Sequence, residues 1–295
     1  MAISAKPRFR SFDAVAEILN DFTLASFSDA SIVKRYSREF GIALLCQQLE
    51  EDRRPSRNSK LLRAVSRSED KPFQFELTDL CRLHWLTLSR KCISVLEFGS
   101  GFSTAIFSDA LRLLNHFFHT WVKGNLRTVT PFHVHSVEEE QRFLDISLQR
   151  LSPQLRPYAS LYRSSVELTQ VDLHIATLYT KLPNICPDLI YLDGPSQFAT
   201  TQESRGFSFA SPERMPMSAD ILTFEFFLQP GTLVVVDGRT ANARFLKAHL
   251  KRNWLYHHES EGDVHVFELQ EAPLGPLNRK QLEFCLADRW LLPVG

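Results

Sequence analysis

One decapeptide organises the chain: Val95-Leu96-Glu97-Phe98-Gly99-Ser100-Gly101-Phe102-Ser103-Thr104. The apolar run 93–98 is typical of a buried parallel strand. Gly99 and Gly101 allow a sharp turn and a close approach of the backbone to a ligand. Ser103 and Thr104 are residue types that begin helices, and helical apolar spacing follows them. We expect a strand, a glycine turn and a helix whose first N–H groups face a ligand.

The glycine turn is compatible with two ligands, a dinucleotide and S-adenosylmethionine. A dinucleotide fingerprint needs a third glycine or an alanine, G-x-G-x-x-G/A, and Thr104 stands at that position. Glu97 precedes Gly99 by two residues and completes an E-x-G-x-G pattern. This pattern resembles the first motif of class I S-adenosylmethionine-dependent methyltransferases. In that family the acid lies under the glycine loop and contacts the amino-acid end of the ligand, directly or through water.

The composition is that of an ordinary globular chain. It has 295 residues and is 44% hydrophobic, with 34 acidic and 34 basic residues. This balance gives no support for nucleic-acid or membrane binding, and no apolar run approaches the ~20 residues of a membrane span. The five scattered cysteines and the poor signal peptide indicate a reducing compartment. We expect a cytoplasmic protein with no nucleic-acid or membrane partner; its oligomeric state is open.

Periodicity and turn signals predict the remaining elements. Strands are expected at 133–138, 158–166, 187–193 and 232–239, with a hairpin at 254–259 and 264–269. Helices are expected at 12–22, 32–49, 59–66, 78–90 with Thr78 as N-cap, 105–114, 141–151, 173–182, 217–228, 242–251 and 279–290. The hairpin resembles the methyltransferase sheet, whose last strand inserts antiparallel, whereas a dinucleotide-binding sheet ends in another parallel strand.

The predicted fold class is therefore α/β: a Rossmann-like methyltransferase sheet, mostly parallel, with a C-terminal antiparallel hairpin and an N-terminal helical extension. The predicted domains are a helical cap at 1–90, an S-adenosylmethionine-binding domain at 91–270 and a packed tail at 271–295.

In open parallel sheets, ligands lie beyond the carboxyl ends of the strands. Glu138 ends the second strand, where an acid can accept hydrogen bonds from ribose hydroxyls, and Glu139 is the near alternative. The competing interpretation is that these acids decorate a helix N-terminus. Cofactor-binding residues implied by the resemblance and the sheet are Glu97, Gly99, Ser100, Gly101, Ser103, Glu138, Ser165 and Asp193.

Asp193 and Asp237 follow the fourth and fifth strands and are the candidate catalytic residues. Arg239 is a candidate for binding an anionic substrate group, with a surface salt bridge as the alternative. The chain also resembles the metal-dependent catechol- and caffeoyl-coenzyme-A-type O-methyltransferases, which bind a divalent ion through an acid and an Asp-Asn pair. Gly238 stands where the Asn would be, so an oxygen ligand is missing and a divalent metal is not favoured.

The leading hypothesis is an S-adenosylmethionine-dependent methyltransferase, of the EC 2.1.1 class, acting on a small-molecule or glycan-like hydroxyl. Such a transfer needs alignment of donor and acceptor and removal of the hydroxyl proton. The long loop 196–216 is expected to cover the substrate. Two alternatives are a non-catalytic binding or assembly module that retains the fold and a nicotinamide-dependent oxidoreductase.

Overall fold

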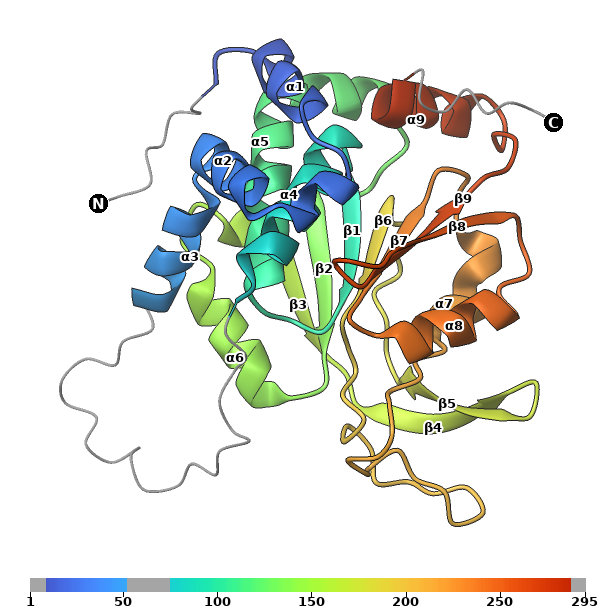
Figure 1. Ribbon diagram of the computed structural model, residues 1–295. Coiled ribbons are helices and arrows are strands. Elements are labelled where there is room, and N and C mark those ends of the chain that lie inside the picture. The colour runs from blue at the N-terminus through green and yellow to red at the C-terminus, as the bar shows by residue number, and fades with distance from the viewer. Residues whose placement is uncertain (1–8, 52–74, 288–295) are drawn as a thin grey trace.

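A computed structural model describes residues 9–51 and 75–287 of the chain (Figure 1). The helix predicted at 59–66 lies outside these residues. Among the described residues, no helix is long and apolar enough to cross a membrane.

Seven strands form the central sheet, in the order β3-β2-β1-β6-β7-β9-β8 (Figure 1). Their bounds are β1 (Ser94–Phe98), β2 (His133–Glu138), β3 (Ala159–Arg163), β6 (Leu189–Leu192), β7 (Leu233–Asp237), β8 (Trp254–Glu259) and β9 (Val264–Leu269). The strand pairs β3–β2, β2–β1, β1–β6 and β6–β7 are parallel, whereas β9 runs antiparallel to both β7 and β8. When the seven strands are numbered along the chain, the order is 3-2-1-4-5-7-6. The predicted fold class, with its antiparallel last strand, is confirmed.

A separate antiparallel pair consists of β4 (Val166–Val171) and β5 (His174–Tyr179). The helix predicted at 173–182 is therefore wrong. Asp172 and Leu173 both have positive φ, 47° and 68°, the backbone that a two-residue hairpin turn requires. Neither residue is a glycine, so the sequence lacks the glycine that usually indicates such a turn.

Nine helices of the α type lie around the sheet in the described part of the chain. They are α1 (Phe12–Asn20), α2 (Ala30–Phe40), α3 (Ile42–Glu51), α4 (Leu77–Ser89), α5 (Phe102–Asn125), α6 (Gln141–Arg150), α7 (Asp220–Phe224), α8 (Thr240–His249) and α9 (Pro276–Leu286). Short 3₁₀ turns occur at η1 (Ala25–Ser28), η4 (Arg156–Tyr158) and η5 (Glu225–Phe227). The predicted helix 217–228 is divided between α7 and η5, and the helix predicted at 279–290 corresponds to α9.

Three helix predictions need correction. The span 32–49 is two helices, because Gly41 adopts φ 74° and ends α2. The helix predicted at 105–114 continues to Asn125, since Phe117 and Phe118 pack on the core and Val122 is buried. Thr78 lies inside α4, whose N-cap is Glu76, so the predicted cap is wrong by two positions.

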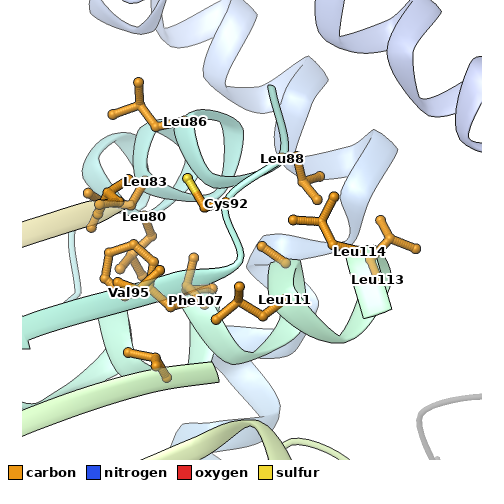
Figure 2. Packing of buried hydrophobic residues seen from close by; sticks show 14 of the residues in the cluster. Leu80, Leu83, Leu86, Leu88, Cys92, Val95, Phe107, Leu111, Leu113 and Leu114 are labelled. Atoms are coloured by element: carbon orange, nitrogen blue, oxygen red, sulfur yellow. The ribbon is translucent and has the colours of Figure 1, made fainter. Parts of the chain in front are cut away.

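The core lies on both faces of the sheet. Val95 of β1 joins one apolar cluster and Leu96 joins the other, as the alternation of side chains along a strand requires. The first cluster includes α1 to α5 and α9, and Figure 2 shows Leu80 and Leu83 of α4 beside Val95 and Phe107. The N-terminal helices thus share the core of the sheet on one face.

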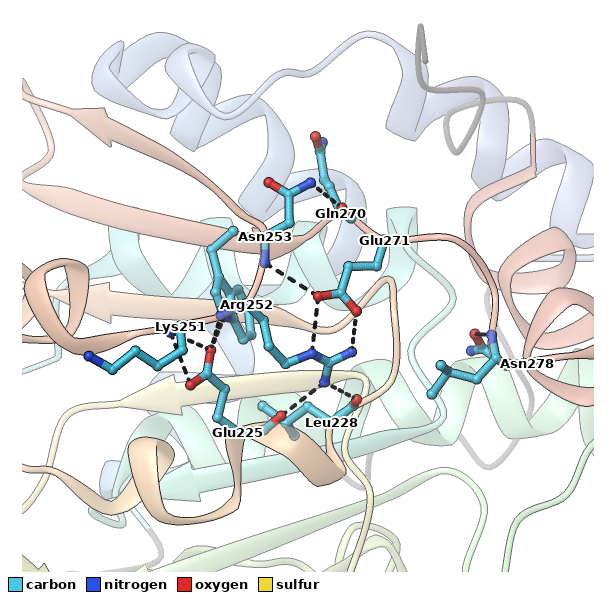
Figure 3. Close-up of polar contacts among 10 residues, drawn as sticks. Glu225, Leu228, Lys251, Arg252, Asn253, Gln270, Glu271 and Asn278 are labelled. Carbon is cyan, nitrogen blue, oxygen red and sulfur yellow. Dashed lines mark hydrogen bonds and ion pairs between the residues drawn. The ribbon is translucent and has the colours of Figure 1, made fainter. Parts of the chain in front are cut away.

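A polar network joins η5 to the start of β8 and the residues just before it (Figure 3). The Arg252 guanidinium donates to both carboxylate oxygens of Glu271, at 3.1 and 2.5 Å, and to the carbonyls of Glu225 and Leu228. The Glu225 carboxylate accepts from the indole N–H of Trp254 at 2.8 Å. Such bidentate, charge-assisted bonds hold the connection between α8 and the terminal hairpin in one geometry.

Candidate functional site

The glycine turn after β1 touches the loop after β6. Gly99 has φ 90°, and a Cβ there would lie 3.2 Å from the backbone of Asp193 and Gly194. At Gly194 a Cβ would lie only 2.6 Å from the Gly99 nitrogen. The two loops therefore approach more closely than side chains allow, and Gly194 is a residue that sequence reasoning missed.

Glu97 lies beneath this turn and is fully buried. Its carboxylate accepts hydrogen bonds from the hydroxyls of Ser103 at 2.5 Å, Thr104 at 2.6 Å, and Ser136 of β2. Burial raises the pKa of Glu97 to about 7, and these three hydroxyls oppose the rise. Glu97 thus braces the start of α5 against β1 and β2.

The start of α5 differs from the sequence prediction. Its N-cap is Gly101, and Ser103 and Thr104 lie within the first turn. The Thr104 hydroxyl accepts from the Gly101 N–H at 3.2 Å while it donates to Glu97. The hydroxyls of Ser103 and Thr104 therefore donate to Glu97, and that of Thr104 also accepts from the glycine turn, so neither residue is the N-cap.

Glu138, at the end of β2, faces the glycine turn. One oxygen of its carboxylate accepts from the Ser100 N–H at 2.9 Å and the Ser100 hydroxyl at 3.0 Å. The other accepts from the Glu140 N–H at 3.0 Å. Burial, and next the adjacent Glu139 carboxylate, raise the pKa of Glu138 to about 7. The structure thus brings Glu138 and Ser100 together, and ribose binding by Glu138 stays a prediction.

Glu139 points to a different set of partners. It accepts from the Tyr179 hydroxyl of β5 at 2.8 Å and from the Ser196 N–H at 2.8 Å. The neighbouring acid therefore anchors the first residue of loop 196–216. Further along, Gln202 accepts from the Leu168 N–H at 2.7 Å, so this loop runs beside β4 (Figure 1).

Asp193 and Arg239 form a unit at the ends of β6 and β7. Arg239 Nε lies 3.7 Å from an Asp193 carboxylate oxygen, and its other nitrogens donate to the carbonyls of Asp193 at 2.6 Å and Pro195 at 2.9 Å. Desolvation raises the pKa of Asp193 to about 6, and the Arg239 guanidinium opposes this rise. The Asp193 side chain is nevertheless 56% exposed. Arg239 thus contacts groups of the chain itself, and binding of an anionic substrate group by Arg239 stays a prediction.

Asp237 ends β7 and is half-buried. The Tyr191 hydroxyl donates to it at 3.4 Å. Burial raises the pKa of Asp237 to about 7, and the Asp79 carboxylate adds to the rise while the Arg82 guanidinium opposes it. Arg82 is buried and donates to Asp79 at 2.9 Å.

Asp79 and Arg82, from the first turns of α4, were missed as site residues. Their spacing of three residues on a helix indicates an ion pair. Nothing in the sequence indicates that this pair influences a carboxylate about 160 residues away.

Ser165 lies in the turn between β3 and β4. It is exposed, and its hydroxyl bonds Thr180 at 2.9 Å. A role near the adenine stays a prediction for this residue.

No family model matches the chain, and no curated protein matches it in sequence. Solved structures are distantly similar. The S-adenosylmethionine complex of O-methyltransferase TomG from Streptomyces achromogenes is 15% identical, with a TM-score of 0.40, over 77% of this chain and 88% of TomG. The S-adenosylhomocysteine-bound methyltransferase PaMTH1 from Podospora anserina is 10% identical, with a TM-score of 0.43, over 92% and 100%. An O-methyltransferase from Bacillus cereus, also bound to S-adenosylhomocysteine, is 13% identical, with a TM-score of 0.37, over 86% and 97%.

The fold assignment rests on the topology of this chain. The strand order 3-2-1-4-5-7-6, the antiparallel strand β9 beside β7, and the glycine turn between β1 and α5 are all present. The chain therefore has the Rossmann-like fold of class I S-adenosylmethionine-dependent methyltransferases.

Proposed function

We propose that the chain binds S-adenosylmethionine over the glycine turn and transfers its methyl group to a hydroxyl of a small-molecule or glycan-like acceptor. The observation that carries the proposal is the turn at 99–101, at the carboxyl end of the central strand β1, with Glu97 beneath it and Glu138 beside it. This edge is where open α/β sheets bind ligands.

The donor side is formed by the turn, the start of α5 and the end of β2. The N-terminus of the long helix α5 favours a negative charge, which the carboxylate at the amino-acid end of the donor provides. Gly99 and Gly101 leave room for close approach, and Ser103 supports the turn through Glu97. Asp193 and Ser165 lie on the loops that follow β6 and β3.

Glu138 is proposed to bind the ribose. A carboxylate has about four acceptor positions, and three of them already receive bonds from Ser100 and Glu140. Binding two ribose hydroxyls thus requires the Ser100 hydroxyl to give way. Ser100→Ala is therefore expected to keep or improve donor binding, whereas Glu138→Gln is expected to weaken it.

On the acceptor side, Asp237 is proposed as the base. Bound S-adenosylmethionine supplies an electrophilic methyl group, and the acceptor hydroxyl must lose its proton as the new bond forms. A carboxylate with a pKa near 7 is well matched to accept that proton at neutral pH. Asp193, paired with Arg239, is proposed to shape the acceptor side, and the exposed Phe198 and Phe207 of loop 196–216 offer apolar surface to cover it.

The residues present do not fit the cation site of the metal-dependent O-methyltransferases. Gly238 brings no side-chain oxygen in place of the Asn amide, and the Arg239 cation pairs with Asp193 at 3.7 Å. A hard divalent cation needs several oxygen ligands, so no step is assigned to one here.

Calorimetric titration of the whole chain with S-adenosylmethionine and S-adenosylhomocysteine tests donor binding. We expect micromolar binding that Glu138→Gln weakens roughly 10- to 100-fold, the value of a hydrogen bond to a charged group. Glu140→Gln is the matched control, because Glu140 is the exposed neighbour and contributes only its backbone N–H. No binding of either ligand to the folded wild type would overturn the proposal, and binding of a nicotinamide cofactor instead would favour the oxidoreductase.

Turnover is tested separately with catechol and a panel of monosaccharides, each with and without Mg²⁺. We expect Asp237→Asn to lower kcat by roughly 10²- to 10⁴-fold while donor binding is unchanged. Donor binding without methylation of any acceptor would favour the non-catalytic module.

A further inference from the structure

Two histidines face each other across the terminal hairpin. His258 of β8 pairs directly with His265 of β9, so both side chains lie on the same face of the sheet. Asp263, from the turn that joins the strands, lies beside them. One ligand atom from each of the three residues lies within 4.8 Å of the other two.

We propose that His258, Asp263 and His265 bind a divalent transition metal of the zinc type. Two imidazoles and one carboxylate suit Zn²⁺, Co²⁺ or Ni²⁺, whereas Mg²⁺ and Ca²⁺ prefer oxygen ligands alone. Three protein ligands leave a fourth position of a tetrahedral site to water. This proposal does not depend on donor binding or methyl transfer.

The existing distances favour the proposal. Metal–ligand bonds of about 2.0–2.2 Å in a tetrahedron place the ligand atoms about 3.4 Å apart. Asp263 Oδ1 already lies 3.2 Å from His258 Nε2 and 3.5 Å from His265 Nε2. Two of the three edges of the ligand triangle therefore already have about the length that a tetrahedral site needs.

Outer contacts orient two of the ligands, as metal sites require. The Tyr256 hydroxyl bonds His265 Nδ1 at 2.9 Å, which leaves Nε2 as the ligand atom. The Thr240 hydroxyl donates to Asp263 Oδ1 at 2.8 Å and lies 3.0 Å from His265 Nε2. A bound metal replaces this last contact, and Thr240 keeps its bond to Asp263.

One rearrangement is needed. The rings of His258 and His265 stack with centroids 3.9 Å apart and planes 13° from parallel. Two imidazoles on one metal cannot stay stacked in this way, because each ring plane must contain its metal bond. His265 is buried but His258 is exposed, so the His258 ring turns toward the metal.

The proposed metal site adjoins the segment between Asp237 and α8. The Asp263 carbonyl accepts from the Gly238 N–H at 3.1 Å, and Thr240 is the first residue of α8. A metal on Asp263 would therefore lie next to the residues that follow the candidate base.

The test is titration of the whole chain, without a histidine tag, with Co²⁺ followed by visible absorption and with Zn²⁺ followed by calorimetry. We expect one equivalent of each metal, and d–d bands of four-coordinate Co²⁺. His258→Ala and Asp263→Asn change exposed residues and should weaken binding more than about 100-fold, beyond the effect of an outer contact. Tyr256→Phe should weaken it about 10- to 100-fold.

His257→Ala is the matched control, because His257 is the adjacent residue on the opposite face of β8 and lies outside the cluster. Unchanged metal binding in this variant, together with loss in His258→Ala, would support the site. Absence of Co²⁺ bands in the wild type would overturn it. Wild-type affinity in His258→Ala, or a thiolate charge-transfer band that places the metal on cysteine, would overturn it equally.

Discussion

Gly194→Ala tests the close contact between the loops after β1 and β6. The added Cβ would lie 2.6 Å from the Gly99 nitrogen, 2.6 Å from the Tyr179 hydroxyl oxygen and 2.9 Å from the Phe98 carbonyl carbon. Cβ contacts below 3.0 Å essentially never occur in proteins, so at least one neighbour must move.

The cost follows from which atoms are touched. Two of the three are backbone atoms of β1 and its turn, and the third belongs to a tyrosine whose hydroxyl donates to Glu139 at 2.8 Å. None is the free end of a flexible side chain. Overpacking of this kind costs about 1–3 kcal/mol, and the rigid neighbours place this variant near 3 kcal/mol.

Urea unfolding measures the loss. With an m-value of about 3 kcal/mol/M, a loss of 3 kcal/mol lowers the midpoint by about 1 M. Gly124→Ala is the matched control, because no atom lies within 4 Å of a Cβ at this position, in the last turn of α5. Since alanine is the better helix former, the control should be neutral or up to about 1 kcal/mol more stable.

A Gly194→Ala midpoint equal to that of the wild type would refute the reasoning, because it would mean that the two loops separate at no cost. A Gly194→Ala midpoint equal to that of Gly124→Ala would refute it as well.

Two further predictions concern stability. Glu97→Gln removes a carboxyl whose pKa burial raises from 4.5 to about 7. Below pH 7 the folded wild type favours the protonated carboxyl, so this group makes the free energy of unfolding fall by roughly 2.4 kcal/mol between pH 5 and pH 7.5. Glu97→Gln should lack this part of the fall, and equal pH slopes in urea unfolding of the two proteins would contradict the prediction. Arg252→Met breaks the bidentate pair with Glu271, in which the arginine side chain is only 8% exposed, and should cost about 3 kcal/mol or more. Lys251→Met breaks the exposed pair with Asp172 and should cost less than about 1 kcal/mol; equal urea midpoints for these two variants would argue against the network.

Several elements were predictable because their signals are local. The strands β1, β6 and β7 are apolar runs that end at, or just before, a glycine or an aspartate, and the two strands of the terminal hairpin flank a short polar turn at 260–263. Residue types gave no turn signal between β4 and β5. Asp172 and Leu173 adopt positive φ without a glycine, and the pairing of β4 with β5 stabilises a turn that residue type alone does not indicate.

Residue types and their spacing determine most of the order of strands and helices along the chain, with β4 and β5 as the exception, because hydrophobic periodicity and turn chemistry are properties of short segments. They also determine the glycine turn and the acids at the strand ends. Only the tertiary structure decides what those acids contact. Glu138 accepts from Ser100, and Arg239 donates to the carbonyls of Asp193 and Pro195. Burial raises the pKa of Asp237, and the Asp79 carboxylate adds to the rise. These effects depend on distances of a few ångströms between groups far apart in the chain, because hydrogen bonds and desolvation act through space.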